Sequence, residues 1–230
     1  MSKLPILISM PHGGTVVPQE VKGLCCLSGE EILKDGDEGT FEIYSKLADL
    51  AQIVVKTEIA RAIVDMNRAK DDFRKDGIIK THTCWGVPVY KNPPVKTIIQ
   101  RLIDHHHTPY HHELSEAAKT GVKLAIDCHT MADVGPPVGP DTGAERPMIC
   151  LGNRQGETCP DNWLIDLAER FGQYFADVRI NDPFAGGYIV AAHCREIPWI
   201  QLEISRTNTV SNNEKASVVA TVIESWFHQL

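Results

Sequence analysis

Short apolar segments alternate with longer amphipathic segments along this chain of 230 residues. The apolar segments are rich in Val and Ile and predict β-strands over residues 6–9, 52–59, 62–67, 122–129, 147–152 and 199–205. Apolar residues at helical spacing predict helices over residues 28–36, 40–52, 93–121, 161–175 and 214–230. Continuously apolar strands separated by helices indicate an α/β fold, in which helices cover both faces of a largely parallel sheet.

Local signals refine the ends of these elements. Ser28 lies three residues before Glu31, which is the spacing of a capping box at the start of a helix. Pro109 interrupts the long helical pattern, so the chain is expected to kink or to begin a new helix there. The segment 131–147 is rich in Gly and Pro and is predicted to be a loop beside a functional site, because functional residues gather where the strands of such sheets end.

The composition narrows the functional classes. A net charge of −7 and a pI near 5.8 argue against nucleic acid or an anionic membrane as the main partner. The N-terminus lacks the features of a signal peptide, and no segment reaches the ~20 apolar residues of a membrane span. The seven cysteines contain no CxxC pair, so neither a disulfide framework nor a cysteine zinc site is indicated. We therefore expect a cytoplasmic protein of one α/β domain or two small ones.

Polar side chains follow two of the predicted strands. His12 comes after strand 6–9 and precedes two glycines, which permit tight turns and a close approach of the backbone to a ligand. Asp127 and His129 end strand 122–129 on the same side, because strand side chains alternate. A carboxylate in that position can accept the distal ring N–H of a metal-ligating histidine or bind the metal itself. A purely structural hydrogen-bonded pair is the alternative.

Four further residues suggest carboxylate binding, proton transfer and stabilisation of an oxyanion. Asn67 and Arg68 offer a directional amide and a rigid guanidinium fork for a carboxylate. The largely uncharged run before Arg68 favours a buried position over a surface salt bridge. Glu203 stands inside an otherwise apolar strand, where burial raises the pKa of a carboxyl group into the range of a general base. Arg61 is a candidate for stabilising an oxyanion.

Together these residues form the set that zinc-assisted amide hydrolysis requires. Zinc bound by His12, His129 and one acid would lower the pKa of its bound water toward ~7, while Glu203 removes the proton and returns it to the leaving amine. The segment KDGDEGTF offers three candidates for the acidic ligand, Asp35, Asp37 and Glu38. We favour Asp37, although an acidic helix N-terminus explains any one of the three equally well.

The chain resembles the N-formylglutamate amidohydrolase family, within the zinc-carboxypeptidase-like group that includes aspartoacylase and succinylglutamate desuccinylase. The shared stretches occur in the family's order and span nearly the whole chain. They are SMPHGG (9–14), KDGDEG (34–39), ARAIVDMNR (60–68), TPYHHEL (108–114), AIDCHT (125–130), CLGNRQGETC (150–159), NDPFAGGYI (181–189) and WIQLEISR (199–206). The resemblance implies a single domain over residues 1–230 and a three-layer α/β/α fold around a mixed, largely parallel sheet.

The resemblance also implies one zinc ion per chain and a role for each candidate residue. His12 and His129 match metal ligands. The KDGDEG segment, with Asp37, looks like the family's source of the acidic ligand, since Thr15 stands where the wider group has its acid. The other residues that the resemblance implies are Glu203 as general base, Arg61 as the carbonyl-polarising arginine, Asn67, Arg68, Gly186 and Gly187 at the substrate, and Asp127 and His111 behind the ligands.

Two departures from the family pattern leave the acyl group and the amino acid open. The acidic segment lacks the Trp that commonly follows it, and Met148 stands where an Asp is usual. The expected reaction is hydrolysis of a small N-acyl amino acid, N-formylglutamate-like, giving formate and glutamate as in histidine degradation. A zinc carboxypeptidase or peptide amidase, which needs an open groove, is one alternative. A non-catalytic metal- or ligand-binding protein on the same fold is another, and the oligomeric state stays open.

HHHTPYHH, residues 105–112, holds five of the ten histidines of the chain. Consecutive histidines on a helix point in several directions, so they cannot all reach one ion. Helical spacing places His107 and His111 on one face, and a metal site there is an alternative. The resemblance points instead to His111 as a residue that lines the pocket or supports the ligands.

Overall fold

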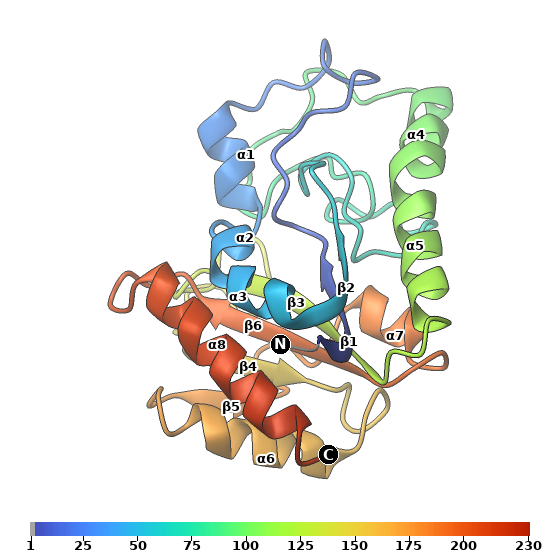
Figure 1. Ribbon diagram of the computed structural model, residues 1–230. Coiled ribbons are helices and arrows are strands. Elements are labelled where there is room, and N and C mark those ends of the chain that lie inside the picture. The colour runs from blue at the N-terminus through green and yellow to red at the C-terminus, as the bar shows by residue number, and fades with distance from the viewer. Residues whose placement is uncertain (1–2) are drawn as a thin grey trace.

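The six strands of the protein form one sheet in the order β2-β1-β3-β6-β4-β5, in a computed structural model that describes residues 3–230 (Figure 1). The strands are β1 (Leu4–Met10), β2 (Ala51–Lys56), β3 (Leu124–Met131), β4 (Ile149–Gly152), β5 (Val178–Ile180) and β6 (Trp199–Ser205). Every neighbouring pair is parallel except β4 and β6, which are antiparallel. The prediction of a mixed, largely parallel sheet is confirmed.

Helices cover both faces of this sheet, which confirms the predicted three layers (Figure 1). Short helices α2 and α3 lie with α6 and α8 over one face, and α5 and α7 lie over the other. The helices are α1 (Gly29–Asp35), α2 (Thr40–Ile43), α3 (Ser45–Leu50), α4 (Lys96–Leu102), α5 (Thr108–Ala118), α6 (Asp161–Phe171), α7 (Tyr188–His193) and α8 (Asn212–Phe227). No helix within residues 3–230 combines the length and the apolar character that crossing a bilayer requires.

The strand predicted over residues 62–67 is wrong. This segment is buried, but its backbone forms local turns, in which Ile63 and Val64 both donate to the carbonyl of Ala60. Its apolar side chains therefore reflect burial beside the sheet rather than membership of it. The predicted helix 40–52 also divides, because α2 ends at Ile43, α3 begins at Ser45, and the last two residues already belong to β2. Strand β5 and helix α7 were not predicted.

The long helical pattern of residues 93–121 forms two helices joined by a π-helical turn, Ile103–His107. Pro109 lies in the first turn of α5, where its missing N–H costs no helical hydrogen bond, so the predicted restart at this proline is confirmed. The capping box at Ser28 and Glu31 is present as well, with both reciprocal hydrogen bonds formed.

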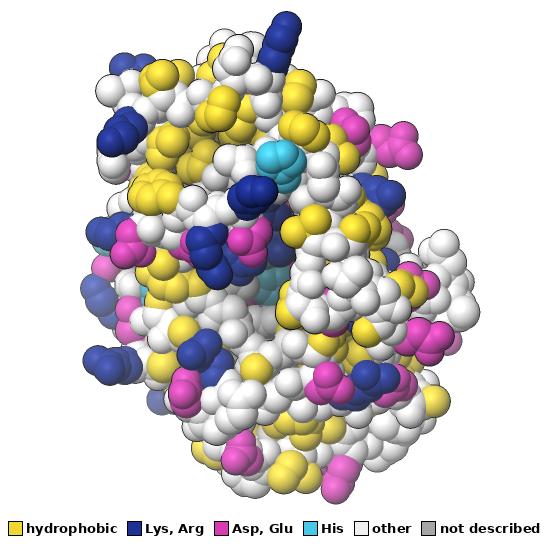
Figure 2. Space-filling view, turned by 180° about the vertical axis from the view of Figure 1, so that it is seen from behind, with side chains coloured by type: hydrophobic (Ala, Val, Ile, Leu, Met, Phe, Trp, Pro, Cys, Tyr) yellow, Lys and Arg dark blue, Asp and Glu magenta, His cyan; other side chains and the backbone are white. Residues whose placement is uncertain are grey.

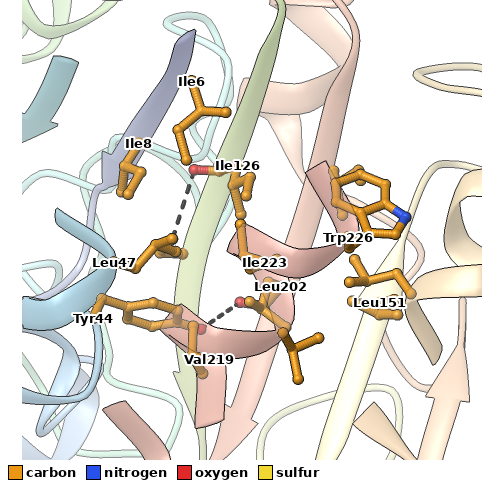
Figure 3. Close-up of a cluster of buried hydrophobic side chains, with 14 of the residues drawn as sticks. Ile6, Ile8, Tyr44, Leu47, Ile126, Leu151, Leu202, Val219, Ile223 and Trp226 are labelled. Carbon is orange, nitrogen blue, oxygen red and sulfur yellow. Dashed lines mark hydrogen bonds between the residues drawn. The ribbon is translucent and has the colours of Figure 1, made fainter. Parts of the chain in front are cut away.

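Alternation along the central strands gives the sheet two different faces: one is apolar throughout, and the other is apolar under α5 and α7 but polar at the carboxyl ends of the strands. In β3, Ile126 and Cys128 point toward α3 and α8, whereas Asp127 and His129 point to the opposite face. Figure 3 shows the apolar face, where Ile126 lies beside side chains of β1, β6, α3 and α8. Tyr44 packs in this core, and its hydroxyl donates to the backbone carbonyls of His129 in β3, at 2.8 Å, and of Leu202 in β6, at 2.9 Å. Figure 3 shows the bond to Leu202.

Candidate active site

The polar face of the sheet opens into a cavity of about 600 Å³ at the carboxyl ends of β1, β3 and β6. Figure 2 shows it as a hollow with histidine at its floor and cationic side chains around it. Parallel strands bring their carboxyl ends to one edge, which explains why segments distant in sequence meet here. The sequence-predicted residues that line the cavity are His12, Asp37, Arg61, Asn67, Arg68, His129, Gly186, Gly187 and Glu203.

Three buried side chains at the cavity floor form a candidate metal centre. One carboxylate oxygen of Asp37 lies 2.8 Å from Nδ1 of His129 and 3.5 Å from Nδ1 of His12. The three potential ligand atoms all lie within 4.8 Å of one another. Each side chain is 3% exposed, so the group is withdrawn from solvent at the bottom of an accessible cavity.

The geometry separates the three acids of the KDGDEG segment. The carboxylate of Asp35 is occupied by Lys80, at 2.9 Å, and by the backbone N–H of Cys84, at 2.7 Å. Glu38 points to solvent. Asp37 alone among the three is placed between the two histidines.

Two further buried carboxylates hold the distal nitrogens of these histidines. Nε2 of His12 lies 2.8 Å from Asp65, and Nε2 of His129 lies 2.9 Å from Asp127. In each ring the Nδ1 atom is therefore the one directed toward Asp37. Carboxylates commonly orient metal-ligating histidines in this way. The sequence placed Asp127 behind His129 but missed Asp65 behind His12, whose only signal was a carboxylate within an apolar run.

The floor of the cavity has the electrostatics of a cation site. Burial disfavours the imidazolium of His129, yet Asp127 and Glu203 more than offset this and raise its pKa well above the usual value. Burial likewise opposes ionisation of Asp37, but the two histidines hold its pKa well below the usual range. Nδ1 of His12 is buried without a hydrogen-bond partner in residues 3–230, although such atoms are normally paired. Two imidazole nitrogens and a carboxylate oxygen are a donor set that suits zinc.

Glu203 faces this centre from the neighbouring strand, since the register of the sheet sets it beside His129. The side-chain amide of Gln201 donates to Glu203 at 3.0 Å and accepts from the backbone N–H of Gly187 at 2.6 Å. Burial raises the pKa of Glu203 above its usual value. Gln201 was missed by the sequence analysis, although it lies on the same face of the strand two residues earlier.

Arg61 lies beside the carboxylates of the centre. Its guanidinium donates to Asp65 at 3.2 Å and to Asp37 at 3.4 Å, and a quarter of its side chain is exposed to the cavity. These contacts fix the guanidinium next to the candidate ligand Asp37. They leave donors of a rigid, permanently charged group for a ligand in the cavity.

Asn67 and Arg68 differ in their surroundings. Asn67 is buried and accepts a hydrogen bond from the backbone N–H of Ile189 at 2.8 Å, which ties its loop to α7. Arg68 is half-buried and donates to the backbone carbonyl of Asp76 at 2.9 Å. Burial was predicted for Arg68, but its half-buried side chain lies at the cavity rim and pairs with the exposed Asp76 at 3.6 Å. That prediction is therefore only partly correct.

The glycines near the site serve close packing of the chain. A Cβ at Gly187 would lie 2.3 Å from the amide of Asn67, and a Cβ at Gly14 would lie 2.2 Å from the backbone of Glu58. The close approach expected after His12 is thus made to another backbone segment rather than to a ligand. At Gly186, φ is +135°, a conformation that glycine adopts without strain.

The histidine cluster supports the cavity from behind without lining it. Nε2 of His107 lies 2.8 Å from the backbone carbonyl of Arg68, and Nε2 of His111 lies 2.9 Å from that of Met66. The other ring nitrogen of His111 lies 2.9 Å from Nε2 of His193 in α7. Among residues 3–230, the side chains grouped as a possible metal centre include none from this cluster.

The Gly/Pro-rich loop 131–147 forms one wall of the cavity, as predicted for a loop beside a site. The residues that it contributes are Met131, Ala132, Pro136, Val138, Gly139, Pro140, Asp141 and Arg146. Arg146 makes a two-pronged ion pair with Asp141, at 2.6 and 3.0 Å, which fastens the loop to itself.

Comparisons with known proteins agree with the resemblance seen in the sequence. Residues 4–209 match the family model described as N-formylglutamate amidohydrolase. An N-formylglutamate deformylase of Pseudomonas putida is 27% identical, over 92% of this chain and 84% of its own. One of Pseudomonas aeruginosa is 25% identical, over 89% and 81%. The crystal structure of N-formylglutamate amidohydrolase from Ralstonia eutropha JMP134 superposes with a TM-score of 0.80 and 18% identity, covering 100% of this chain and 96% of that one.

Proposed function

The chain belongs to the N-formylglutamate amidohydrolase family, and we propose that it hydrolyses the amide bond of a small N-acyl amino acid resembling N-formylglutamate, giving formate and glutamate. The observation that carries this proposal is the meeting of His12, Asp37 and His129 opposite Glu203 in one cavity. The Pseudomonas relatives bear the name N-formylglutamate deformylase and match most of this chain.

We assign to the centre one zinc ion, held by Nδ1 of His12, a carboxylate oxygen of Asp37 and Nδ1 of His129. When bound, the ion would supply a Lewis acid and lower the pKa of a coordinated water. Asp65 and Asp127 accept the Nε2–H groups of the two histidines, so that Nδ1 is the atom that each ring would offer to the ion.

Glu203 acts as the general base. It accepts a proton from the attacking water and then delivers it to the nitrogen of the leaving amine. Its pKa, raised by burial, suits both steps, because a more basic carboxylate takes up a proton more readily near neutral pH. Gln201 orients the carboxylate by donating to one of its oxygens. Arg61 donates to the carbonyl oxygen of the substrate as negative charge develops there.

The substrate carboxylate binds to Arg68, with Asn67 beside it and the backbone at Gly186 and Gly187 forming the adjacent wall. A guanidinium fork matches a carboxylate in shape and charge. His111, through the carbonyl of Met66, helps to hold this loop in place. The site thus carries a water-activating centre and a carboxylate anchor in the same cavity.

We propose a small substrate rather than a peptide. Loop 131–147 and residues 183–187 line the cavity and would limit its extent, whereas a peptidase requires an open groove for the rest of its chain. A non-catalytic binding role gives no reason for the burial of Glu203 beside the two histidines, because burying a carboxylate costs free energy. We further propose that residues 1–230 act as one domain in the cytoplasm, in a step of histidine degradation.

The proposal is tested by measuring hydrolysis of N-formyl-, N-acetyl- and N-succinylglutamate by the purified protein with added zinc. We expect the formyl compound to be cleaved, and a chelator to abolish the activity until zinc is restored. Metal content is measured in parallel. Failure to cleave any of the three, or less than about a tenth of an equivalent of divalent ion bound in excess zinc, would contradict the proposal.

A further inference from the structure

The cavity wall carries more cationic side chains than the proposed reaction uses. They are Arg61, Arg68, Lys75, Lys80, Arg146 and Arg206. Four of them already have a carboxylate partner, and these ion pairs are Arg61–Asp37, Arg68–Asp76, Lys80–Asp35 and Arg146–Asp141. Lys75 is exposed at the rim. Arg206 is half-buried, and no carboxylate within residues 3–230 pairs with it.

Arg206 lies next to the candidate metal centre. It is the first residue after β6, and its guanidinium donates to the carbonyl of Gly36 at 3.0 Å, directly before Asp37 in the chain. Its backbone N–H donates to the carbonyl of Met131 at 2.8 Å, where β3 ends. A guanidinium has five N–H donors, and this carbonyl occupies one of them. The remaining donors are available to a ligand in the cavity.

A buried lysine fixes the backbone on both sides of Arg206. Nζ of Lys215 donates to the carbonyls of Ser205 and Thr207, at 2.8 and 2.7 Å, and its side chain is fully buried. Because these carbonyls flank Arg206, the hydrogen bonds hold its backbone in place. A fixed backbone reduces the conformational entropy that Arg206 would lose on binding a ligand.

We propose that Arg206 is a specificity-determining residue that binds a second carboxylate of the substrate, apart from the one that Arg68 anchors. A half-buried cation without a counter-charge gains most from an anionic ligand, because its desolvation is already partly complete. The second carboxylate belongs either to the amino-acid side chain or to the acyl group. This inference rests on the proposed function, since it assigns a binding residue of that same site.

The test compares two variants of Arg206 with wild type on substrates that carry or lack the second carboxylate. In Arg206→Gln, we expect kcat/KM for N-formylglutamate to fall by about 10- to 100-fold through KM, as for one lost charged hydrogen bond. For N-formylglutamine, which lacks the side-chain charge, kcat/KM of the same variant should change by less than about threefold. Arg206→Lys keeps the charge without the guanidinium fork, and its kcat/KM for N-formylglutamate should lie between those of wild type and Arg206→Gln. Arg101→Gln, at an exposed arginine of α4, is the control.

N-succinylglutamine and N-acetylglutamine distinguish the two sources of the carboxylate. A loss confined to N-formylglutamate assigns it to the amino acid, and a loss confined to N-succinylglutamine assigns it to the acyl group. An equal loss on charged and neutral substrates would overturn the inference. Calorimetry separates this from failure of the proposed function, because it measures binding whether or not the protein turns over. Arg206→Gln should weaken binding of glutamate to the zinc-loaded protein more than that of glutamine if the amino acid supplies the carboxylate, and binding of succinate more than that of acetate if the acyl group does. The absence of both differences would overturn the inference.

Discussion

At the residue scale, the chemistry of the centre depends on which nitrogen each histidine presents. Asp65 and Asp127 are both fully buried and each lies within 2.9 Å of an Nε2 atom. A buried carboxylate facing a ring nitrogen stabilises the tautomer with a proton on that nitrogen. In that neutral tautomer the opposite nitrogen carries the lone pair, and in both His12 and His129 it faces Asp37.

Replacing Asp65 tests this arrangement. In Asp65→Asn, the ring of His12 loses a charged partner, and we expect zinc affinity to fall by about 10- to 100-fold. Competition titration against a chromophoric chelator measures this, with Asp49→Asn at an exposed position as the control. An affinity equal to that of wild type would show that Asp65 does not orient the ligand.

Replacing Glu203 separates proton transfer from metal binding. In Glu203→Gln, the amide keeps the size of the side chain but cannot accept a proton, so kcat should fall by about 10²- to 10⁴-fold. Metal content and thermal midpoint, measured on the same preparation, should stay close to those of wild type. Substantial hydrolysis by this variant would assign the base to another residue.

At the element scale, the site depends on contacts between loops that follow different strands. The segment carrying Asn67 is held on one side by the π-helical turn and α5, through His107 and His111, and on the other by the start of α7. Neither the π-helical turn nor α7 was predicted. α7 is six residues long, and its recognition required the packing partners that the sequence does not reveal.

The start of α7 provides a test at this scale. In Gly187→Ala, the new Cβ would meet the amide of Asn67 at 2.3 Å, so the two loops must separate. We expect kcat/KM to fall at least about tenfold and the free energy of unfolding to drop by about 1–3 kcal/mol. Kinetics and urea denaturation measure the two effects. Gly23→Ala, where the added Cβ meets nothing within 4 Å, should alter neither.

At the scale of the whole molecule, the apolar core on one face of the sheet lies apart from the residues that line the cavity. One face is covered by a continuous apolar core that includes Trp226 of α8, and the cavity opens on the other face. A substitution in that core should therefore lower stability without changing the chemistry of the site. This separation follows from the two-residue alternation of each strand.

Trp226→Ala tests this separation. The fully buried ring leaves a large cavity on truncation, and we expect a loss of about 3–5 kcal/mol in the free energy of unfolding, measured in urea. KM of the folded protein should not change. Ile165→Ala, on the exposed side of α6, should shift stability by less than about 0.5 kcal/mol. A small shift for Trp226→Ala would mean that this core is not cooperative with the sheet.

The sequence by itself determined the layered fold and part of the site, because both follow from local patterns. Strand alternation placed Asp127 and His129 on one side, and the order of the motifs placed the chain in its family. The tertiary structure decided the role of segment 62–67, which burial alone could not distinguish from a strand. It also placed Asp37, rather than Asp35 or Glu38, between the two histidines.

Partners distant in the sequence were decided by the tertiary structure as well. Asp65 contacts His12 although the two are 53 positions apart in the sequence. Likewise, only the tertiary structure shows that no carboxylate within residues 3–230 pairs with Arg206. Hydrophobic periodicity records which face of an element is buried, but not which element it packs against. The pairing of side chains in the site therefore depends on contacts between residues far apart in the sequence, which only the tertiary structure brings together.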